Sequence, residues 1–219
     1  MDDTAPMQLT EWDAGETTGV FPPVPSFLKL AGRRVLIVGA GPMAASKLSG
    51  LLLAGARVAI VAPHISDAMR SAIKGPMSHL VELHERPVAA SDLDGAWFVV
   101  AAAPPEVNRF VAQQAESRQV FVNAVDDPSV ASAYAAGVVS RGEITIAVST
   151  GGRAPALAGL MREALEELIP QEATDWLAVA QQARVEWKQA GVPMSERRVL
   201  LLDALLRRYN LHPDGKRDR

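Results

Sequence analysis

Residues 34–55 contain the pattern that most constrains how this chain folds. Four consecutive apolar residues, Val35 to Val38, predict a strand buried on both faces. The strand runs into Gly39-Ala40-Gly41-Pro42-Met43-Ala44, a G-x-G-x-x-A loop that opens a helical pattern ending near Gly55. A second apolar run, Val58 to Ala62, completes a βαβ unit of about 30 residues. This succession predicts the first part of a dinucleotide-binding fold, and the alternative is a doubly wound domain whose first loop only turns tightly.

The residues of the glycine loop have separate expected roles in binding a dinucleotide. Gly39 can make the tight turn, Gly41 lets the backbone approach a pyrophosphate, and Ala44 lets the helix pack closely on the strand. The free N–H groups and the dipole of the helix N-terminus favour the negative charge of phosphates. The loop is therefore predicted to hold the phosphates of a cofactor.

The end of the second strand departs from the usual nucleotide-binding pattern. An acidic residue commonly stands there to accept hydrogen bonds from the ribose hydroxyls, but this chain has Val61-Ala62-Pro63-His64. Either backbone groups and a neutral His64 hold the ribose, or the cofactor carries a 2′-phosphate. Because no arginine lies in this turn, NAD is the predicted cofactor. His64 could equally be a solvated residue at the start of the next helix.

The composition argues against several classes of function. With no cysteine among 219 residues, the chain can form no disulfide and no thiolate metal site. A net charge of −3 and an aromatic content of 5% give no indication of nucleic-acid binding. No apolar run reaches the roughly 18 residues that span a membrane, so we expect a soluble, cytoplasmic protein with no membrane partner. Residues 1–20 are acidic and lack periodicity, which predicts a flexible leader.

Strands and helices alternate through the first part of the chain. Residues 27–30 predict a short edge strand before the first buried strand. Later apolar runs at 80–83, 97–103 and 120–122 predict further strands, with an amphipathic helix between the last two. The expected fold class is therefore α/β, with a Rossmann-type doubly wound parallel sheet that forms an NAD-binding domain over residues 21–133.

The pattern changes after this domain. Two β-rich runs, 134–140 and 143–149, flank Arg141-Gly142 and predict a hairpin outside the parallel sheet. A short hairpin with one apolar face is rarely stable alone, so a partner subunit is a candidate to cover it. With the helix expected over 156–168, we assign residues 134–169 to a small α+β dimerisation segment.

The remaining residues, 170–219, predict a C-terminal helical domain. Their apolar spacing indicates helices over 174–190 and 195–209, which Gly191-Val192-Pro193 separates. No catalytic residue is predicted in this part of the chain.

Two acids follow a buried strand on the side of the sheet where the glycine loop is expected. They lie in Asn123-Ala124-Val125-Asp126-Asp127-Pro128 and would face the nicotinamide ring of a bound cofactor. Asp126 or Asp127 could therefore take or hold a proton during hydride transfer. The alternative is that one of them caps a turn before Pro128, as aspartate often does. Position alone leaves the choice between the two acids open.

A second polar segment, Ser149-Thr150-Gly151-Gly152-Arg153, precedes a predicted helix. Its hydroxyls, backbone N–H groups and guanidinium could together bind carboxylates or phosphates. The alternative is a helix N-cap preceded by a glycine turn. The four histidines, at positions 64, 79, 84 and 212, show no metal-ligand spacing, so no resident metal is expected and any metal would be a substrate.

Taken together, these stretches resemble the precorrin-2 dehydrogenase and sirohydrochlorin ferrochelatase family, which also forms the N-terminal half of bifunctional sirohaem synthases. The resemblance covers nearly all of the chain after the leader, and the pairing of NAVDDP with VSTGGRAPALA is more specific than the glycine loop. Because the methyltransferase half is absent, the chain resembles the stand-alone form. The matching stretches are Phe21-Pro22-Pro23, VLIVGAGPMAASKLSGLLLAGARV, AAAPPEVN, FVNAVDDP, AVSTGGRAPALAGLMREALE and MSERR.

The resemblance implies NAD-dependent oxidation of precorrin-2 to sirohydrochlorin, in some members followed by insertion of Fe²⁺ to give sirohaem. It maps the essential aspartate of the family onto Asp126 and implies a homodimer. Two positions depart from relatives: Thr150 stands where some carry serine, and Ala103 where threonine is frequent. The expected cofactor contacts are Gly39, Gly41, Pro42, Met43, Pro63, His64, Ala102 and Ala103, and the expected substrate contacts are Asn123, Ser149, Thr150, Gly151, Gly152 and Arg153.

Three other functions stay open at this point. The chain could be a dehydrogenase that leaves chelation to a separate enzyme. It could be a nucleotide-sensing module whose C-terminal helices signal to a partner. It could also oxidise an unrelated small acid, although that chemistry would need a proton donor such as histidine or lysine near Asp126, and the sequence offers no clear one.

Overall fold

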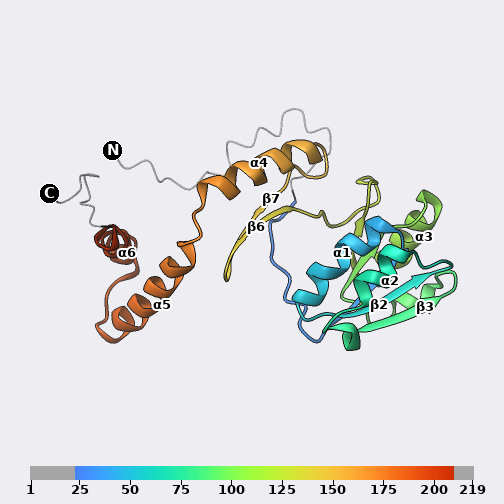
Figure 1. Cartoon of the computed structure of the whole chain (residues 1–219), viewed down its shortest axis with the longest axis horizontal. Helices are drawn as coiled ribbons and strands as arrows, with labels where there is room; N and C mark the ends of the chain where they lie inside the picture. The colour runs from blue at the N-terminus through green and yellow to red at the C-terminus, as the bar shows by residue number, and fades with distance from the viewer. Residues whose placement is uncertain (1–22, 210–219) are drawn as a thin grey trace. The chain divides into compact units, whose positions relative to one another are not determined.

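The structure is a computed structural model that describes residues 23–209 (Figure 1). The leader predicted over residues 1–20 lies outside the described residues, as do Phe21, Pro22 and His212. Contacts divide the chain into two compact units, Met1–Tyr134 and Ala135–Arg219, and each is described by itself. Among residues 23–209, no helix has the length and apolar character to cross a lipid bilayer.

The first unit is built on a five-stranded sheet with the order β3-β2-β1-β4-β5, and all of its strands are parallel. The chain moves outward from β1 to β3 and then returns to place β4 on the other side of β1. This reversal is typical of a doubly wound sheet, so the predicted Rossmann-type fold class is confirmed. The strands are β1 (Arg34–Val38), β2 (Arg57–Ala62), β3 (Val81–Glu85), β4 (Phe98–Ala101) and β5 (Phe121–Ala124).

Helices pack on both faces of this sheet because its central strands are apolar on both. Ile37 of β1 packs in one core cluster with Leu48 of α1, while its neighbour Leu36 packs in a second cluster with Val111 of α3. All four of these residues have no exposed surface. The helices are α1 (Pro42–Leu53), α2 (Asp67–Ile73) and α3 (Pro105–Glu116), with 3-10 turns η3 (Ser78–Leu80) and η4 (Ala90–Leu93).

The edge strand predicted over residues 27–30 is wrong. These residues form no strand, and Phe27 is 69% exposed whereas Leu30 is buried. The N–H of Gly32 donates to the carbonyl of Gly55 at 2.8 Å, and the N–H of Arg33 donates to that of Leu30 at 2.9 Å. The segment therefore turns directly into β1 and forms no strand pairing.

The second unit begins with the predicted hairpin, formed by β6 (Gly137–Arg141) and β7 (Ile144–Val148). Its turn is Gly142-Glu143, one residue later than predicted, and Gly142 has a φ of +58°, which suits a tight two-residue hairpin turn. Three helices follow: α4 (Pro155–Leu168), α5 (Ala173–Gln189) and α6 (Met194–Arg208).

Arg141 explains why the turn shifts by one residue. Its side chain is buried and donates from Nε to the Ile169 carbonyl at 2.9 Å and from Nη2 to the Glu166 carbonyl at 2.5 Å. These carbonyls belong to the end of α4, where backbone acceptors lack helical partners and a positive charge is favourable. Arg141 therefore fastens the hairpin to α4.

The apolar stripe of α4 is largely exposed within the single chain. Four of its residues keep about half or more of their surface: Leu157, Leu160, Met161 and Leu168. This exposure agrees with the expectation of a covering partner, which stays a prediction. The division of the second unit into domains over 134–169 and 170–219 also stays a prediction.

Candidate active site

The loops at the carboxyl edge of the parallel sheet form the candidate active site. Because the strands are parallel, their carboxyl ends share one edge, and a crevice is expected where the strand order reverses, between β1 and β4. Backbone hydrogen bonds extend the sheet by one residue and hold the first residues of these loops side by side. These bonds join Gly39 N to Val61 O (2.9 Å), Ala102 N to Val38 O (2.8 Å) and Val125 N to Ala101 O (2.8 Å).

The glycine loop and the loop after β4 pack backbone against backbone. Gly39 has a φ of +103°, and a Cβ atom there would lie 2.2 Å from the carbonyl oxygen of Ala102 and 3.3 Å from the N of Ala103. No side chain fits between them. The tight turn predicted at Gly39 is thus imposed by Ala102, and both alanines predicted as cofactor contacts lie beside it, half-buried.

The N-terminus of α1 fits an anionic group bound outside the loop. Gly41 is its N-cap residue, no side chain caps the helix, and its first turn holds no acid. The first helical hydrogen bond joins Ala45 N to Gly41 O, which leaves the N–H groups of Met43 and Ala44 outside the helical ladder. A Cβ on Gly41 would meet nothing within 4 Å, so no packing contact inside the protein requires glycine at this position. Pro42 and Met43, two predicted cofactor contacts, are exposed here.

Ser66 supports the glycine loop from the end of β2, a role that the sequence analysis missed. Its hydroxyl donates to the Ala40 carbonyl at 2.6 Å and accepts from the N–H of Met69 at 3.2 Å as the N-cap of α2. A serine before a helix signals a cap, but the contact with Ala40 joins residues far apart in sequence. Pro63 and His64, the predicted ribose contacts, immediately precede this support and are exposed.

Asn108 supports the loop after β4 and was also missed. It is 2% exposed on α3, and its Oδ1 accepts the N–H of Ala103 at 3.1 Å. Because the backbone group is a donor, the oxygen of the amide must face it. The signal available in the sequence was its spacing, since Asn108 lies on the apolar face of α3 with Val111 and Ala115.

The structure distinguishes the two acids after β5. Asp127 forms the turn, because its Oδ1 accepts from the Ser129 hydroxyl at 2.5 Å and its carbonyl accepts from Val130 N at 3.4 Å. The turn-forming alternative therefore applies to Asp127. Asp126 is exposed with a φ of +60°, and its carboxylate makes no hydrogen bond with any described residue. Its carboxylate is available for chemistry, and its catalytic role stays a prediction.

Asn123, a predicted substrate contact, is 8% exposed, and its amide nitrogen donates to the Ala133 carbonyl at 3.1 Å. This bond directs its donor group to the protein's own backbone. Contact with a substrate stays a prediction for this residue.

The other predicted substrate contacts form a loop before α4, in the second unit. The Ser149 hydroxyl accepts from Gly151 N at 3.2 Å, and Oγ1 of Thr150 accepts from Ala154 N at 3.2 Å. Gly151 and Gly152 have φ values of +62° and +74°, and Arg153 is exposed. The hydroxyls thus shape the glycine turn that the alternative expected, but the expected side-chain cap is wrong, since the N-cap residue of α4 is Ala154 and no side chain caps the helix. Anion binding by this loop stays a prediction.

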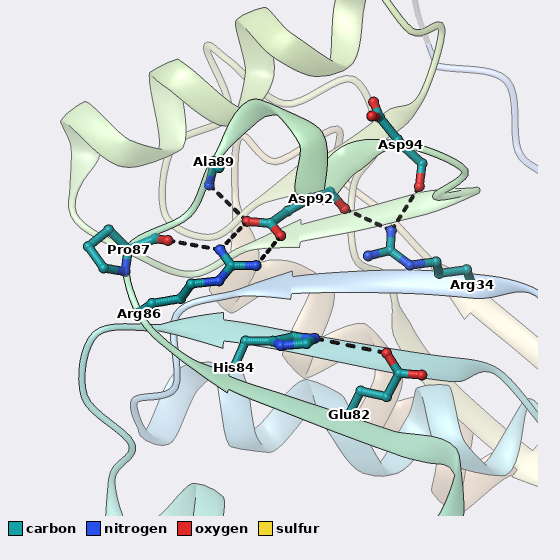
Figure 2. A network of polar contacts seen from close by, with 8 residues as sticks. All are labelled: Arg34, Glu82, His84, Arg86, Pro87, Ala89, Asp92 and Asp94. Carbon is teal, nitrogen blue, oxygen red and sulfur yellow. Dashed lines mark hydrogen bonds and ion pairs between the residues drawn. The ribbon is translucent and has the colours of Figure 1, made fainter.

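An ion-pair network fixes the connection between β3 and β4 (Figure 2). Arg86 donates from Nη1 and Nη2 to the two carboxylate oxygens of Asp92, at 2.7 and 2.6 Å, and Ala89 N donates to the same group at 2.8 Å. Arg34 reaches the backbone carbonyls of Asp92 and Asp94. The hydrogen bonds from Arg86, and then that from Ala89, hold the pKa of Asp92 below its usual value despite its burial. This network is structural, because Arg86 and Asp92 pair with each other and Arg34 binds backbone carbonyls of the connection.

No cluster of three or more histidine, aspartate or glutamate side chains suited to a metal ion occurs within the described part of the chain.

Comparison with known proteins identifies the family. A family model described as NAD(P)-binding matches residues 26–136, and one described as sirohaem biosynthesis protein central matches residues 141–168. The siroheme synthase of Methylobacillus flagellatus is 37% identical over 182 residues, which make up 82% of this chain and 38% of that protein. The siroheme synthase of Salmonella typhi is 38% identical over 184 residues, again 38% of its length. The chain thus spans about 38% of the length of these curated relatives.

A solved structure resembles the chain over most of both lengths. The structure titled "SirC, precorrin-2 dehydrogenase" is 27% identical, with a TM-score of 0.67, and the match covers 88% of this chain and 94% of that one. The sequence matches and this structural match agree with the resemblance drawn from the motifs. The chain therefore belongs to the NAD(P)-binding family of sirohaem biosynthesis proteins, which includes precorrin-2 dehydrogenases and the corresponding part of sirohaem synthases.

Proposed function

We propose that the chain catalyses the NAD-dependent oxidation of precorrin-2 to sirohydrochlorin. The observation that carries the proposal is the carboxylate of Asp126, which is exposed and pairs with none of residues 23–209, at the sheet edge that also carries the glycine loop. Support comes from the relatives, which are named as a precorrin-2 dehydrogenase and as siroheme synthases.

Asp126 acts as the base of the reaction. Oxidation removes a hydride and a proton from precorrin-2, and NAD⁺, when bound, supplies the hydride acceptor. The carboxylate of Asp126 takes the proton, so the products are sirohydrochlorin, NADH and a proton that passes to solvent. Asp127 takes no part in this proton transfer, because its carboxylate accepts a hydrogen bond from Ser129.

The carboxyl edge of the sheet holds the cofactor. The N–H groups of Met43 and Ala44 bind the pyrophosphate beside Gly39, Gly41 and Pro42. Pro63 and His64 lie against the adenosine ribose, and Ala102 and Ala103 line the crevice. NAD is preferred to its 2′-phosphorylated form because residues 62–66 include no lysine or arginine that would pair with that phosphate.

The second unit provides the substrate contacts and the dimer interface. Precorrin-2 bears carboxylates around its rim, which suit the exposed Arg153 and the backbone N–H group of Gly152. The exposed apolar stripe of α4 supports a homodimer in which a second copy covers it. Chelation of Fe²⁺ by the same site is a second activity, which the names of the siroheme synthase relatives favour.

An anaerobic assay with precorrin-2 and NAD tests the proposal. We expect NADH to form together with the spectrum of sirohydrochlorin, and a metal-dependent spectral change after Fe²⁺ or Co²⁺ is added to the same cuvette. Oxidation without that change would leave a dehydrogenase that depends on a separate chelatase. If the folded protein binds NAD but forms no NADH, the proposed dehydrogenase activity is contradicted and the nucleotide-sensing module is favoured.

A further inference from the structure

The loop that carries Asp126 is tied at its base to strand β5. The N–H of Val122 donates to the Ser132 hydroxyl at 2.8 Å, and the carbonyl of Val122 accepts from the N–H groups of Ser132 and Ala133, both at 2.9 Å. The next residue of the strand, Asn123, donates its side-chain amide to the Ala133 carbonyl at 3.1 Å. Asp126 lies between the two ends that these bonds hold together.

These bonds satisfy backbone groups that the sheet itself leaves free. β5 is the last strand of the sheet, so the N–H and carbonyl of Val122 face no neighbouring strand. Ser132 and Ala133 take the place of that strand with a hydroxyl and two N–H groups. Asn123 adds a nearly buried hydrogen bond one residue further along. The base of the loop is therefore fixed from both of its ends.

Asp126 has a backbone conformation that needs such support. Its φ of +60° lies in the left-handed region, where a residue other than glycine is strained by about 1 kcal/mol. A strained residue keeps its conformation only where the surrounding structure determines it. The turn of Asp127 and Ser129 supports the loop on one side of Asp126. Without the tied base, the loop could relax and carry the carboxylate away from the crevice.

We propose that Ser132 and Asn123 are positioning residues for Asp126. They act through the base of the loop, Ser132 on Val122 and Asn123 on Ala133, and hold the carboxylate at the carboxyl edge of the sheet. The proposal rests on the proposed function, and it gives Asn123 a role through Ala133 in place of a direct contact with the substrate.

The first test compares Ser132→Ala with Ser132→Thr, which keeps the hydroxyl. Because one net hydrogen bond is lost at an exposed position, Ser132→Ala should lower kcat for precorrin-2 oxidation roughly tenfold. The dissociation constant for NAD, measured by calorimetry, should stay within about twofold, because the glycine loop is unchanged. Ser132→Thr should restore most of kcat. Amide exchange at Val122 should also be about tenfold faster in Ser132→Ala than in the wild type.

Ser117→Ala is a matched control. Ser117 is also exposed, and its hydroxyl donates to the Gln114 carbonyl at 3.0 Å just beyond the end of α3. Its loss removes a comparable hydrogen bond in the turn that precedes β5, outside the Asp126 loop, so kcat should not change. Equal losses of kcat in Ser117→Ala and Ser132→Ala, or no rescue by threonine, would overturn the positioning role.

Asn123→Ala separates positioning from substrate contact. A positioning role predicts a lower kcat with a KM for precorrin-2 within about twofold of the wild type. A raised KM with an unchanged kcat would overturn the role of Asn123 and support the contact.

The outcome for the wild type separates this inference from the function on which it rests. If the wild type binds NAD but forms no NADH from precorrin-2, the proposed function fails and the positioning role fails with it. If the wild type is active and Ser132→Ala matches it in kcat, the positioning role alone is overturned.

Discussion

A Cβ atom on Gly39 would lie 2.2 Å from the carbonyl oxygen of Ala102, closer than two non-bonded atoms can approach. Gly41, two residues further on, has open space where its own Cβ would be. The two glycines of one loop therefore stand in different surroundings. Gly39 is required by the packing of the fold, whereas the open space beside Gly41 fits its predicted role in binding a pyrophosphate.

Gly39→Ala and Gly41→Ala should separate stability from nucleotide binding. Gly39→Ala should destabilise the protein by about 2 kcal/mol or more, because it adds a clash to an unfavourable φ. Gly41→Ala should change stability by less than about 0.5 kcal/mol, since its φ of −77° suits alanine. It should nevertheless weaken NAD binding about tenfold, because the methyl group would lie where the pyrophosphate approaches. Thermal unfolding and calorimetry with NAD measure the two effects, and equal loss of stability in both variants would contradict this assignment.

Asp126→Gly should remove activity without loss of stability. Glycine adopts a φ of +60° without strain, so the variant should be as stable as the wild type or up to about 1 kcal/mol more stable. It lacks the carboxylate, so NADH formation from precorrin-2 should fall to background. Urea unfolding and the anaerobic assay measure the two properties. A glycine variant that kept more than about a tenth of the wild-type kcat would contradict the role of Asp126 as base.

Regular elements were predictable because their signals are local, whereas the supports of the site were not. The buried run from Val35 to Val38 and the glycine loop carry their own periodicity and turn chemistry. The contact of Ser66 with Ala40 depends on how α2 packs beside the glycine loop, 26 residues earlier in the chain. The contact of Asn108 with Ala103 depends on how α3 packs on the loop that precedes it. No local pattern encodes those distances.

The wrong or undecided sequence predictions also depended on contacts that local patterns do not encode. The turn of the hairpin moved by one residue because the guanidinium of Arg141 binds carbonyls at the end of α4, a contact between distant residues. Residues 27–30 pair with no strand, because the chain turns after Leu30 and Gly32 then bonds to Gly55 in the loop after α1. The choice between Asp126 and Asp127 needed the Ser129 contact and the backbone φ, and a sequence motif gives neither.

Asp92→Asn should destabilise the protein at neutral pH and lose its effect in acid. Hydrogen bonds from Arg86 and Ala89 lower the pKa of Asp92, so the folded state favours the carboxylate. This stabilisation is complete above the pKa of an unfolded aspartate, about 4, and is lost as the pH falls through the lower folded value. We expect a loss of about 1–2 kcal/mol at pH 7 that shrinks below pH 4 or so. Urea unfolding across pH checks this, and a difference that does not vary with pH would contradict it.

Arg141→Met should destabilise the second unit and leave the first intact. The variant keeps most of the apolar stem but leaves the carbonyls of Glu166 and Ile169 without their donor, at a cost of about 2 kcal/mol. Amide exchange should therefore become faster in β6, β7 and the end of α4. The parallel sheet should keep its protection, and NAD affinity should not change. Faster amide exchange in β1 or β4 would contradict the expectation that the first unit keeps its stability when the second is destabilised.

The central claim is that the carboxylate of Asp126, and not that of Asp127, serves the oxidation of precorrin-2. The most direct measurement is anaerobic NADH formation by the wild type, Asp126→Asn and Asp127→Asn under the same conditions. Asparagine tolerates a positive φ and can still accept from Ser129, so both variants should fold and bind NAD like the wild type. We predict that Asp126→Asn loses at least about a hundredfold in kcat, while Asp127→Asn stays within about threefold of the wild type. Equal activity of Asp126→Asn and the wild type, or a loss confined to Asp127→Asn, would contradict the account.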